Sequence, residues 1–269
     1  MKVSKLKHHL QQATPAILGR IPRALLFAGF LITASLLAIP QAMAVSPPME
    51  TDDPDTPGDG NWEINMGSII TRRHDETEAE LPLMDINYGL GDNIQLKIEA
   101  PLIHVKEAGS EWKSGLGSVE LGVKWRFIDK KDTGFDMSIY PQFSSGWNTL
   151  SGRHGLDDPG EQIFLPVEFA TEIGSFGLVG EVGRGFDSKG PEQWEGGVVL
   201  THKCGEKVEC MAELHETVNP HDVQSLVNFG INWELSDSVS IMAALGREFG
   251  PDTDEQQHSR VYLGIQINK

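Results

Sequence analysis

The sequence predicts an all-β fold, an antiparallel up-and-down transmembrane β-barrel of about 12 strands. Three observations predict it. Twelve segments alternate apolar with polar residues, the connections between them are alternately long and short, and the chain opens with features of an export signal. A period of two places alternate side chains on opposite faces of a strand. Alternating loop lengths are typical of outer-membrane barrels, which have tight turns at one end and longer loops at the other.

The first 44 residues resemble a secretory signal peptide. Basic residues between Lys2 and Arg23 precede an apolar run at 24–39, and the small residues Ala42 and Ala44 follow it. Signal peptidase needs small residues at its cleavage site, so we expect cleavage after Ala44. The alternative is a retained anchor, because the apolar run approaches the roughly 20 residues that span a bilayer.

Cleavage would leave an acidic chain of one barrel domain. It removes five of the 22 basic residues and none of the 39 acidic ones, which changes the net charge from -17 to -22. Such acidity argues against a nucleic-acid partner. We see no linker that divides the chain, and we expect an irregular Pro/Asp/Gly-rich lead-in at 45–61 and the barrel at 62–269. Asp52, Asp53 and Asp55 could hold the lead-in against the barrel or bind a cation, although Asp-Pro pairs are also ordinary turn chemistry.

The segment 118–127 shows the alternation most clearly. Val119, Leu121, Val123, Trp125 and Phe127 share one face, and the residues between them are mostly charged. In a soluble sandwich this apolar face would pack in a core; in an outer-membrane barrel it would face lipid, and the charged face would line the lumen. The twelve predicted strands are 62–71, 82–88, 94–103, 118–127, 135–143, 163–173, 176–183, 194–202, 208–215, 225–234, 239–246 and 260–268.

Loop lengths favour the barrel over the sandwich. Every second connection is tight, which places both chain ends on the periplasmic side, and a sandwich has no reason to sort its loops in this way. Aromatic residues near strand ends fit an interfacial girdle, the alternative being scattered core aromatics. These residues are Trp62, Tyr88, Trp125, Phe127, Trp194 and Trp233.

The two cysteines, Cys204 and Cys210, lie close together after an export signal. An oxidising compartment favours a disulfide that closes a short hairpin, with free thiols as the alternative. Together with His202 or His215 they do not have the spacing of a zinc motif. We therefore expect no metal at this position.

Charged residues on the inward parity are the candidate lumen lining. A ring of mixed charge can select permeants by sign, and the excess of acids favours cations or neutral solutes. The alternative is that these groups pair with one another and fill a narrow lumen, because twelve strands lie between filled small barrels and open porins. The candidates are Glu63, Asp85, Lys97, Glu99, Glu120, Lys124, Arg126, Asp136, Glu168, Glu181, Glu195, Glu213 and Arg260.

Two stretches resemble a known family. TDDPDTPGDGNWEIN at 51–65 and the strand at 117–127 are similar to segments of Gram-negative outer-membrane proteins labelled the MetA-pathway of phenol degradation family. The resemblance implies an outer-membrane barrel, located in the cell outer membrane, with a part in the uptake of small molecules, aromatic or apolar ones among them. One departure is the end of the chain, Ile267-Asn268-Lys269, where such barrels usually have an aromatic residue.

These features predict a channel or transporter-like barrel without a cofactor. Its expected partners are outer-membrane lipid, lipopolysaccharide and a small-molecule permeant; the oligomeric state stays open. A closed structural or interaction barrel is the alternative, and a lipid-modifying enzyme is a weaker one. Enzyme candidates are Ser151, His154 and Asp157, or His215 with Glu213, but there is no G-x-S-x-G elbow and we expect no enzyme. Acidic loop residues could gather calcium or magnesium but lack the spacing of a calcium loop, so we expect solvated charge: His74, Asp75, Glu76, Glu78, Glu80, Asp252, Asp254 and Glu255.

Overall fold

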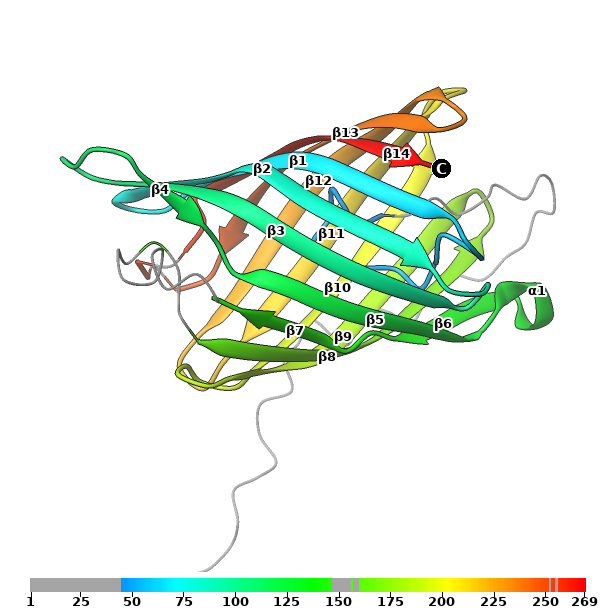
Figure 1. Ribbon diagram of the computed structural model, residues 1–269, viewed down its shortest axis with the longest axis horizontal. Coiled ribbons are helices and arrows are strands. Elements are labelled where there is room, and N and C mark those ends of the chain that lie inside the picture. Colours follow the sequence, from blue (N-terminus) through cyan, green and yellow to red (C-terminus); the bar gives the residue numbers. More distant parts are fainter. Residues whose placement is uncertain (1–44, 147–155, 157–159, 252, 255) are drawn as a thin grey trace, which may run out of the picture. The chain divides into compact units, whose positions relative to one another are not determined.

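The computed structural model describes residues 45–146, 156, 160–251, 253–254 and 256–269, which belong to one compact unit. Its strand segments form a single antiparallel sheet that closes on itself (Figure 1). The elements are β1 (Trp62–Arg72), β2 (Glu76–Gly89), β3 (Ile94–Glu107), β4 (Lys113–Leu116), β5 (Val119–Ile128), α1 (Lys130–Thr133), β6 (Phe135–Ile139), β7 (Gln142–Ser145), β8 (Glu161–Ile173), β9 (Phe176–Asp187), β10 (Gln193–Lys203), β11 (Val208–Val218), β12 (Val223–Ser236), β13 (Val239–Phe249) and β14 (Ser259–Asn268).

The sheet is a closed barrel because its first and last strands pair. β1 and β14 run antiparallel from Glu63 opposite Asn268 to Arg72 opposite Ser259. β4 and β5 both pair with β3, and β6 and β7 both lie between β5 and β8, so each couple forms one broken strand. The segments therefore make a closed barrel of 12 antiparallel strands, as the sequence predicted.

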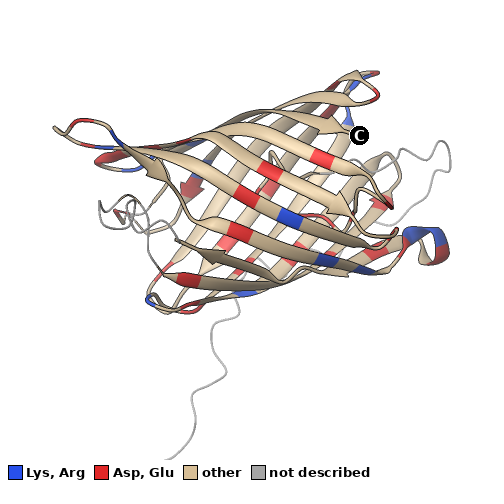
Figure 2. Cartoon of the chain, in the orientation of Figure 1, with Lys and Arg blue, Asp and Glu red and all other residues tan. Residues whose placement is uncertain are grey.

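The barrel has its apolar side chains outside and its polar ones inside. On β5, Val123 and Trp125 are 49% and 52% exposed, whereas Lys124 between them is 2% exposed. Glu168 on β8 is fully buried. Figure 2 shows acidic and basic positions within the strands as well as in the loops. A sandwich would bury the apolar face of β5. Because this face is exposed and the charged face is buried, the structure is a barrel with apolar side chains outside.

Several strands extend beyond their predicted ends on the side of the long connections. β2 begins at Glu76, although 76–81 was predicted to be loop, and β3 continues to Glu107. The backbone ladder continues there, with Thr71 opposite Glu78, and Glu76, Glu78 and Glu80 alternate with Thr77, Ala79 and Leu81. A register shift between Glu80 and Leu83 separates this alternation from that of residues 83–89. The shift moves the inward parity by one residue, and Thr77 and Ala79 are only weakly apolar, so the continuous alternation that predicts a strand is interrupted.

Two local features interrupt the predicted pattern. The predicted strand 135–143 is divided into β6 and β7 at Tyr140 and Pro141, because proline has no N–H for the ladder. The short connection before β6 contains α1, which Asp129 caps by accepting the Lys131 backbone N–H at 2.8 Å. This hydrogen bond lowers the pKa of Asp129 below its ordinary value. Among the described residues, no helix has the length and apolar character needed to cross a membrane.

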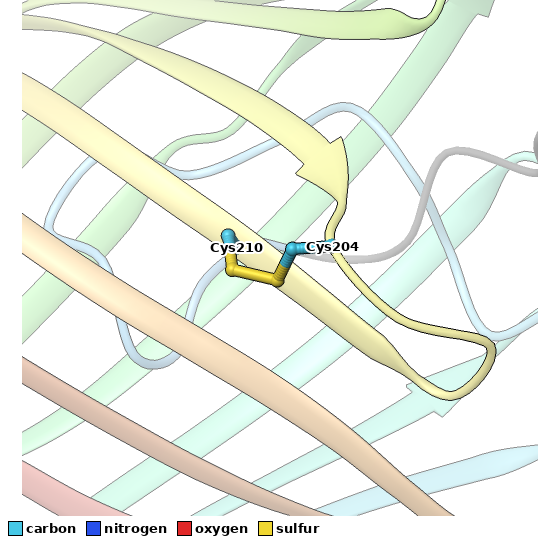
Figure 3. Close-up of a disulfide and its surroundings, with 2 residues drawn as sticks. All are labelled: Cys204 and Cys210. Atoms are coloured by element: carbon cyan, nitrogen blue, oxygen red, sulfur yellow. A yellow bond between two sulfur atoms is a disulfide. The ribbon is translucent and has the colours of Figure 1, made fainter.

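The predicted disulfide is present in the structure. Cys204 and Cys210 are joined across the tight connection between β10 and β11, with their Cα atoms 5.9 Å apart (Figure 3). The Cys204 N–H also donates to the Val208 carbonyl at 3.0 Å. The bridge therefore closes a short hairpin at the end of the barrel where the connections are tight.

Candidate functional site

Most of the lead-in segment, residues 45–61, lies inside the barrel, and its last three residues are exposed at the turn end. Val45 and Thr51 are fully buried, and the segment contacts β5, β11 and β14, which are far apart around the sheet. In Figure 1 its blue trace runs between the two walls. The sequence predicted an irregular lead-in and left its position open. The structure makes it the main occupant of the lumen among the described residues.

Ion pairs connect the acidic side chains of the lead-in to bases on the wall. Lys124 Nζ lies 2.9 Å from Asp52 Oδ1, and Arg126 Nη1 lies 3.3 Å from Asp55 Oδ1. On the far side Glu50 pairs with Arg260 of β14. The possibility that lead-in aspartates hold the segment against the barrel is thus realised by Asp52 and Asp55.

Glu213 of β11 holds the backbone of the same segment. Its carboxylate accepts the N–H of Thr51 at 2.7 Å and the N–H of Glu50 at 3.2 Å, and Asn228 Nδ2 donates to it at 3.1 Å. Glu213 is 3% exposed. A buried carboxylate needs such donors, because an unpaired buried charge is costly.

Two wall glycines give the lead-in the room to pack closely. A side chain at Gly197 of β10 would overlap Thr51, and one at Gly230 of β12 would overlap the Met49 methyl group. Met49 also belongs to an apolar cluster of inward residues with Met242. Because glycine has no Cβ, the side chains of Thr51 and Met49 can pack directly against the wall at these two positions.

Two chambers remain open inside the barrel, one on each side of the lead-in. The turn-end chamber, near Trp62 and Lys269, has a volume of about 810 Å³, and the loop-end chamber has about 480 Å³. Asp85 and Lys97 on the wall line both of them. Lys97 Nζ forms ion pairs with Glu99 at 3.0 Å and Glu120 at 3.1 Å. The two chambers therefore adjoin at the charged residues Asp85 and Lys97. Ser46 and Asp52 of the lead-in also line both chambers.

The predicted lumen residues divide into three groups. Asp136, Glu168 and Glu213 line neither chamber: Asp136 accepts the Lys130 N–H at 2.8 Å, and Glu168 accepts from Ser138 and lies 3.5 Å from Lys124. The turn-end chamber is lined by Glu63, Asp85, Lys97, Lys124 and Arg126, and the loop-end chamber by Asp85, Lys97, Glu99, Glu120, Glu181, Glu195 and Arg260. The sequence left open whether these charged residues line an open lumen or pair with one another. The structure shows both arrangements, in different residues.

Uncharged inward residues were not among the candidates. Asn65 and Asn87 donate to the Asp85 carboxylate at 3.0 and 3.1 Å, and Gln95 donates to Asn87 at 2.8 Å. Tyr140 is fully buried, with the Lys124 ammonium 4.6 Å from its ring centre. Asn65, Asn87 and Gln95 lie on the inward parity of their strands, and Tyr140 lies on the polar parity of the predicted strand 135–143; parity is the signal that would have found them.

The structure places no catalytic or metal-binding arrangement among the described residues that were candidates for an enzyme or a metal site. Ser151, His154 and Asp157 lie outside the described residues, as do Asp252 and Glu255. Glu213 is engaged with the lead-in backbone. Among the described residues, no group of three or more His, Cys, Asp or Glu side chains could hold a metal ion.

No protein-family model matches the chain, and no curated protein matches it in sequence. Solved structures match its fold. The COG4313 outer membrane channel from Pseudomonas putida F1 has a TM-score of 0.64 at 10% identity, over 82% of this chain and 100% of that one. The NanC porin has 0.53 at 7% identity, over 77% and 98%. The KdgM porin has 0.52 at 9% identity, over 76% and 98%. The chain has the fold of an outer-membrane β-barrel.

Proposed function

We propose that this chain is a channel of the cell outer membrane that lets small molecules pass without a cofactor. The observation that carries the proposal is the pair of adjoining chambers inside a closed barrel whose outer face is apolar. Chambers of about 810 and 480 Å³ are in the range that holds small molecules. The outer face would contact lipid and, at the loop end, lipopolysaccharide.

Its proposed place in the outer membrane rests on the predicted signal peptide, which implies export, and on the apolar outer face of the barrel. We propose cleavage after Ala44, export, and insertion with the short turns toward the periplasm. The lead-in would then enter the lumen from the periplasmic end, because it continues into β1 at Trp62. The resemblance to the MetA-pathway of phenol degradation family adds small aromatic or apolar compounds to the proposed permeants.

The second candidate, a closed structural or interaction barrel, is favoured by one specific observation. The lead-in is anchored to the wall by Glu213 and by ion pairs to Lys124, Arg126 and Arg260. A segment so firmly held could block the passage between the chambers. The two candidates differ in whether solutes pass while the lead-in stays in place.

Conductance in planar bilayers separates these candidates. The processed protein is compared with a variant that lacks residues 45–57, after heat-modifiable mobility has shown that both are folded. For a channel we expect reproducible single-channel steps from the wild type and larger steps from the deletion. Steps from the deletion alone would favour the closed barrel, and folded protein without steps in either form would contradict the channel proposal.

A further inference from the structure

The loop-end chamber contains more acidic groups than its bases neutralise. Lys97 is shared by Glu99 and Glu120, and Arg260 pairs with Glu50. Within the described part of the chain, no further lysine or arginine lines this chamber. Asp52 pairs with Lys124 of the wall, whereas no ion pair joins Glu181 or Glu195 to a lysine or arginine among the described residues. An enclosed space lined mainly by charges of one sign concentrates ions of the opposite charge.

Two of these carboxylates are available to a ligand. Glu181 of β9 is 8% exposed and lines the chamber, and it has no hydrogen bond or ion pair with any residue that the structure describes. Glu195 of β10 accepts from Gln193 Nε2 at 2.8 Å and forms no ion pair with a lysine or arginine among the same residues; the basic group nearest in its electrostatic surroundings is His215 of β11. Burying a carboxylate without a partner is costly, so Glu181 is positioned to accept an incoming cation.

The strand register brings both carboxylates to one place. Glu181 lies opposite Gly197 of β10, and Glu195 is two residues before Gly197 on the same face. The Cα atoms of such diagonal neighbours on adjacent strands are about 7–8 Å apart. Thr51 occupies the space over Gly197 itself, and both carboxylates line the chamber, where they can approach one cation. His215, opposite Gly197 on β11, borders the same place and is 7% exposed.

An aromatic ring lies beside the two acids. Phe164 of β8 faces inward and lines the chamber, and its ring atoms are 2.5 Å from where a Cβ of Gly183 would be. Gly183 is the β9 residue directly opposite Glu195. The missing side chain thus lets the ring lie next to Glu195. Carboxylates combined with an aromatic ring are a recurrent means of binding organic ammonium ions.

We propose that the loop-end chamber binds a small organic cation with an apolar or aromatic body, its ammonium group between Glu181 and Glu195 and its body against Phe164. The inference rests on the proposed channel and names the substrate class of that site. A compact metal ion fits less well, because no group of three suitable ligands exists among the described residues. Anions would meet the unpaired carboxylates and be repelled.

Binding and conduction are measured separately, so that failures of the two proposals can be told apart. The processed, detergent-solubilised protein is titrated by calorimetry with benzyltrimethylammonium, whose charge does not depend on pH. Benzenesulfonate tests the sign of the charge, and tetramethylammonium tests the ring. The variants are Glu181→Gln, Glu195→Gln and Phe164→Leu. Glu209→Gln is the control, because Glu209 is an inward acid of β11 that lines neither chamber.

The expected result is binding of benzyltrimethylammonium and none of benzenesulfonate. Each Glu→Gln change should weaken binding by roughly fivefold, as for a partly screened ion pair. Phe164→Leu should weaken it by roughly two- to fivefold, and tetramethylammonium should bind correspondingly less well. Glu209→Gln should bind as the wild type does.

Three results would overturn the inference: no binding of benzyltrimethylammonium, equal binding of benzenesulfonate, or equal loss in Glu209→Gln and Glu181→Gln. If potassium chloride still gave single-channel steps, the channel proposal would survive any of these results. Conversely, saturable binding to a protein that does not conduct would support the cation site and contradict the channel.

Discussion

Replacing Glu213 by Gln should release the lead-in segment from the wall. The carboxylate accepts two lead-in N–H groups, from Thr51 at 2.7 Å and from Glu50 at 3.2 Å. Hydrogen bonds to a charged acceptor contribute about 1.5–3 kcal/mol each, and the longer one contributes less. Gln has the same shape and keeps one acceptor oxygen, but it has no charge. Its amide NH₂ group would face one of the two lead-in N–H donors and could not accept from it.

The net loss of docking free energy is then roughly 2–3 kcal/mol, which raises the undocked fraction roughly 30- to 150-fold. Deuterium exchange at the Glu50 and Thr51 amides measures this directly, because both N–H groups are protected only while they donate to Glu213. Under the proposed channel function, single-channel recordings should also show more frequent openings to a larger conductance.

Glu209→Gln is the matched control, since Glu209 lies on the same strand and is 5% exposed. Among the described residues it accepts no hydrogen bond from the lead-in. If exchange at Glu50 and Thr51 were equally slow in wild type and Glu213→Gln, the docking role of Glu213 would be wrong. Equal acceleration in both variants would point to general loosening of β11 instead.

Three further predictions follow from other parts of the structure. Gly230→Val should displace Met49 and increase proteolysis of the lead-in, because a side chain at Gly230 overlaps the Met49 methyl group. Val123→Lys should cost roughly 2–4 kcal/mol in a bilayer and reduce the yield of heat-modifiable barrel, because Val123 faces outward. The low pKa of Asp129 means that its cap stabilises α1 above the unfolded pKa of about 3.9 and is lost as pH falls through the folded value. The exchange protection of the Lys131 amide should fall in that acidic range.

Each of these predictions has its own control. Gly180→Val, on β9, where the added Cβ would meet only the Gly197 carbonyl oxygen at 3.7 Å, should leave proteolysis of the lead-in unchanged. Trp112→Lys introduces the same charge at an exposed loop residue and should fold normally; equal yields for Val123→Lys and Trp112→Lys would contradict a lipid-facing wall. In Asp129→Ala, Lys131 protection should no longer change between pH 5 and pH 3, and persistence of the change would assign it to another group.

Much of the barrel could be predicted because it depends on local patterns. The faces of β5 were predicted from alternation alone, and so was the hairpin disulfide between Cys204 and Cys210 from spacing and compartment. Strand ends were predicted less well: β2 begins at Glu76, but a register shift between Glu80 and Leu83 changes the parity of the alternation within the strand. The break at Pro141 carried a visible signal, because proline lacks the N–H that a ladder requires.

The lumen could be predicted only as a set of inward residues. Parity placed Lys124 and Glu213 inside, but it did not indicate that Lys124 would meet Asp52 or that Glu213 would bind the Thr51 backbone. Those pairs join positions 72 and 162 residues apart in the sequence. No periodic pattern links them, since the lead-in has no period of its own.

The sequence by itself determined which side chains face in, which face out, and the order and direction of the strands, because a two-residue period and loop length are properties of neighbouring residues. Only the tertiary structure decided what fills the interior. Closure brings the walls within reach of one irregular segment, and the segment settles where its acids and N–H groups find partners. The same closure leaves Glu181 and Glu195 beside Phe164 without an ion pair to a lysine or arginine among the described residues, and this juxtaposition is the basis of the proposed ligand site.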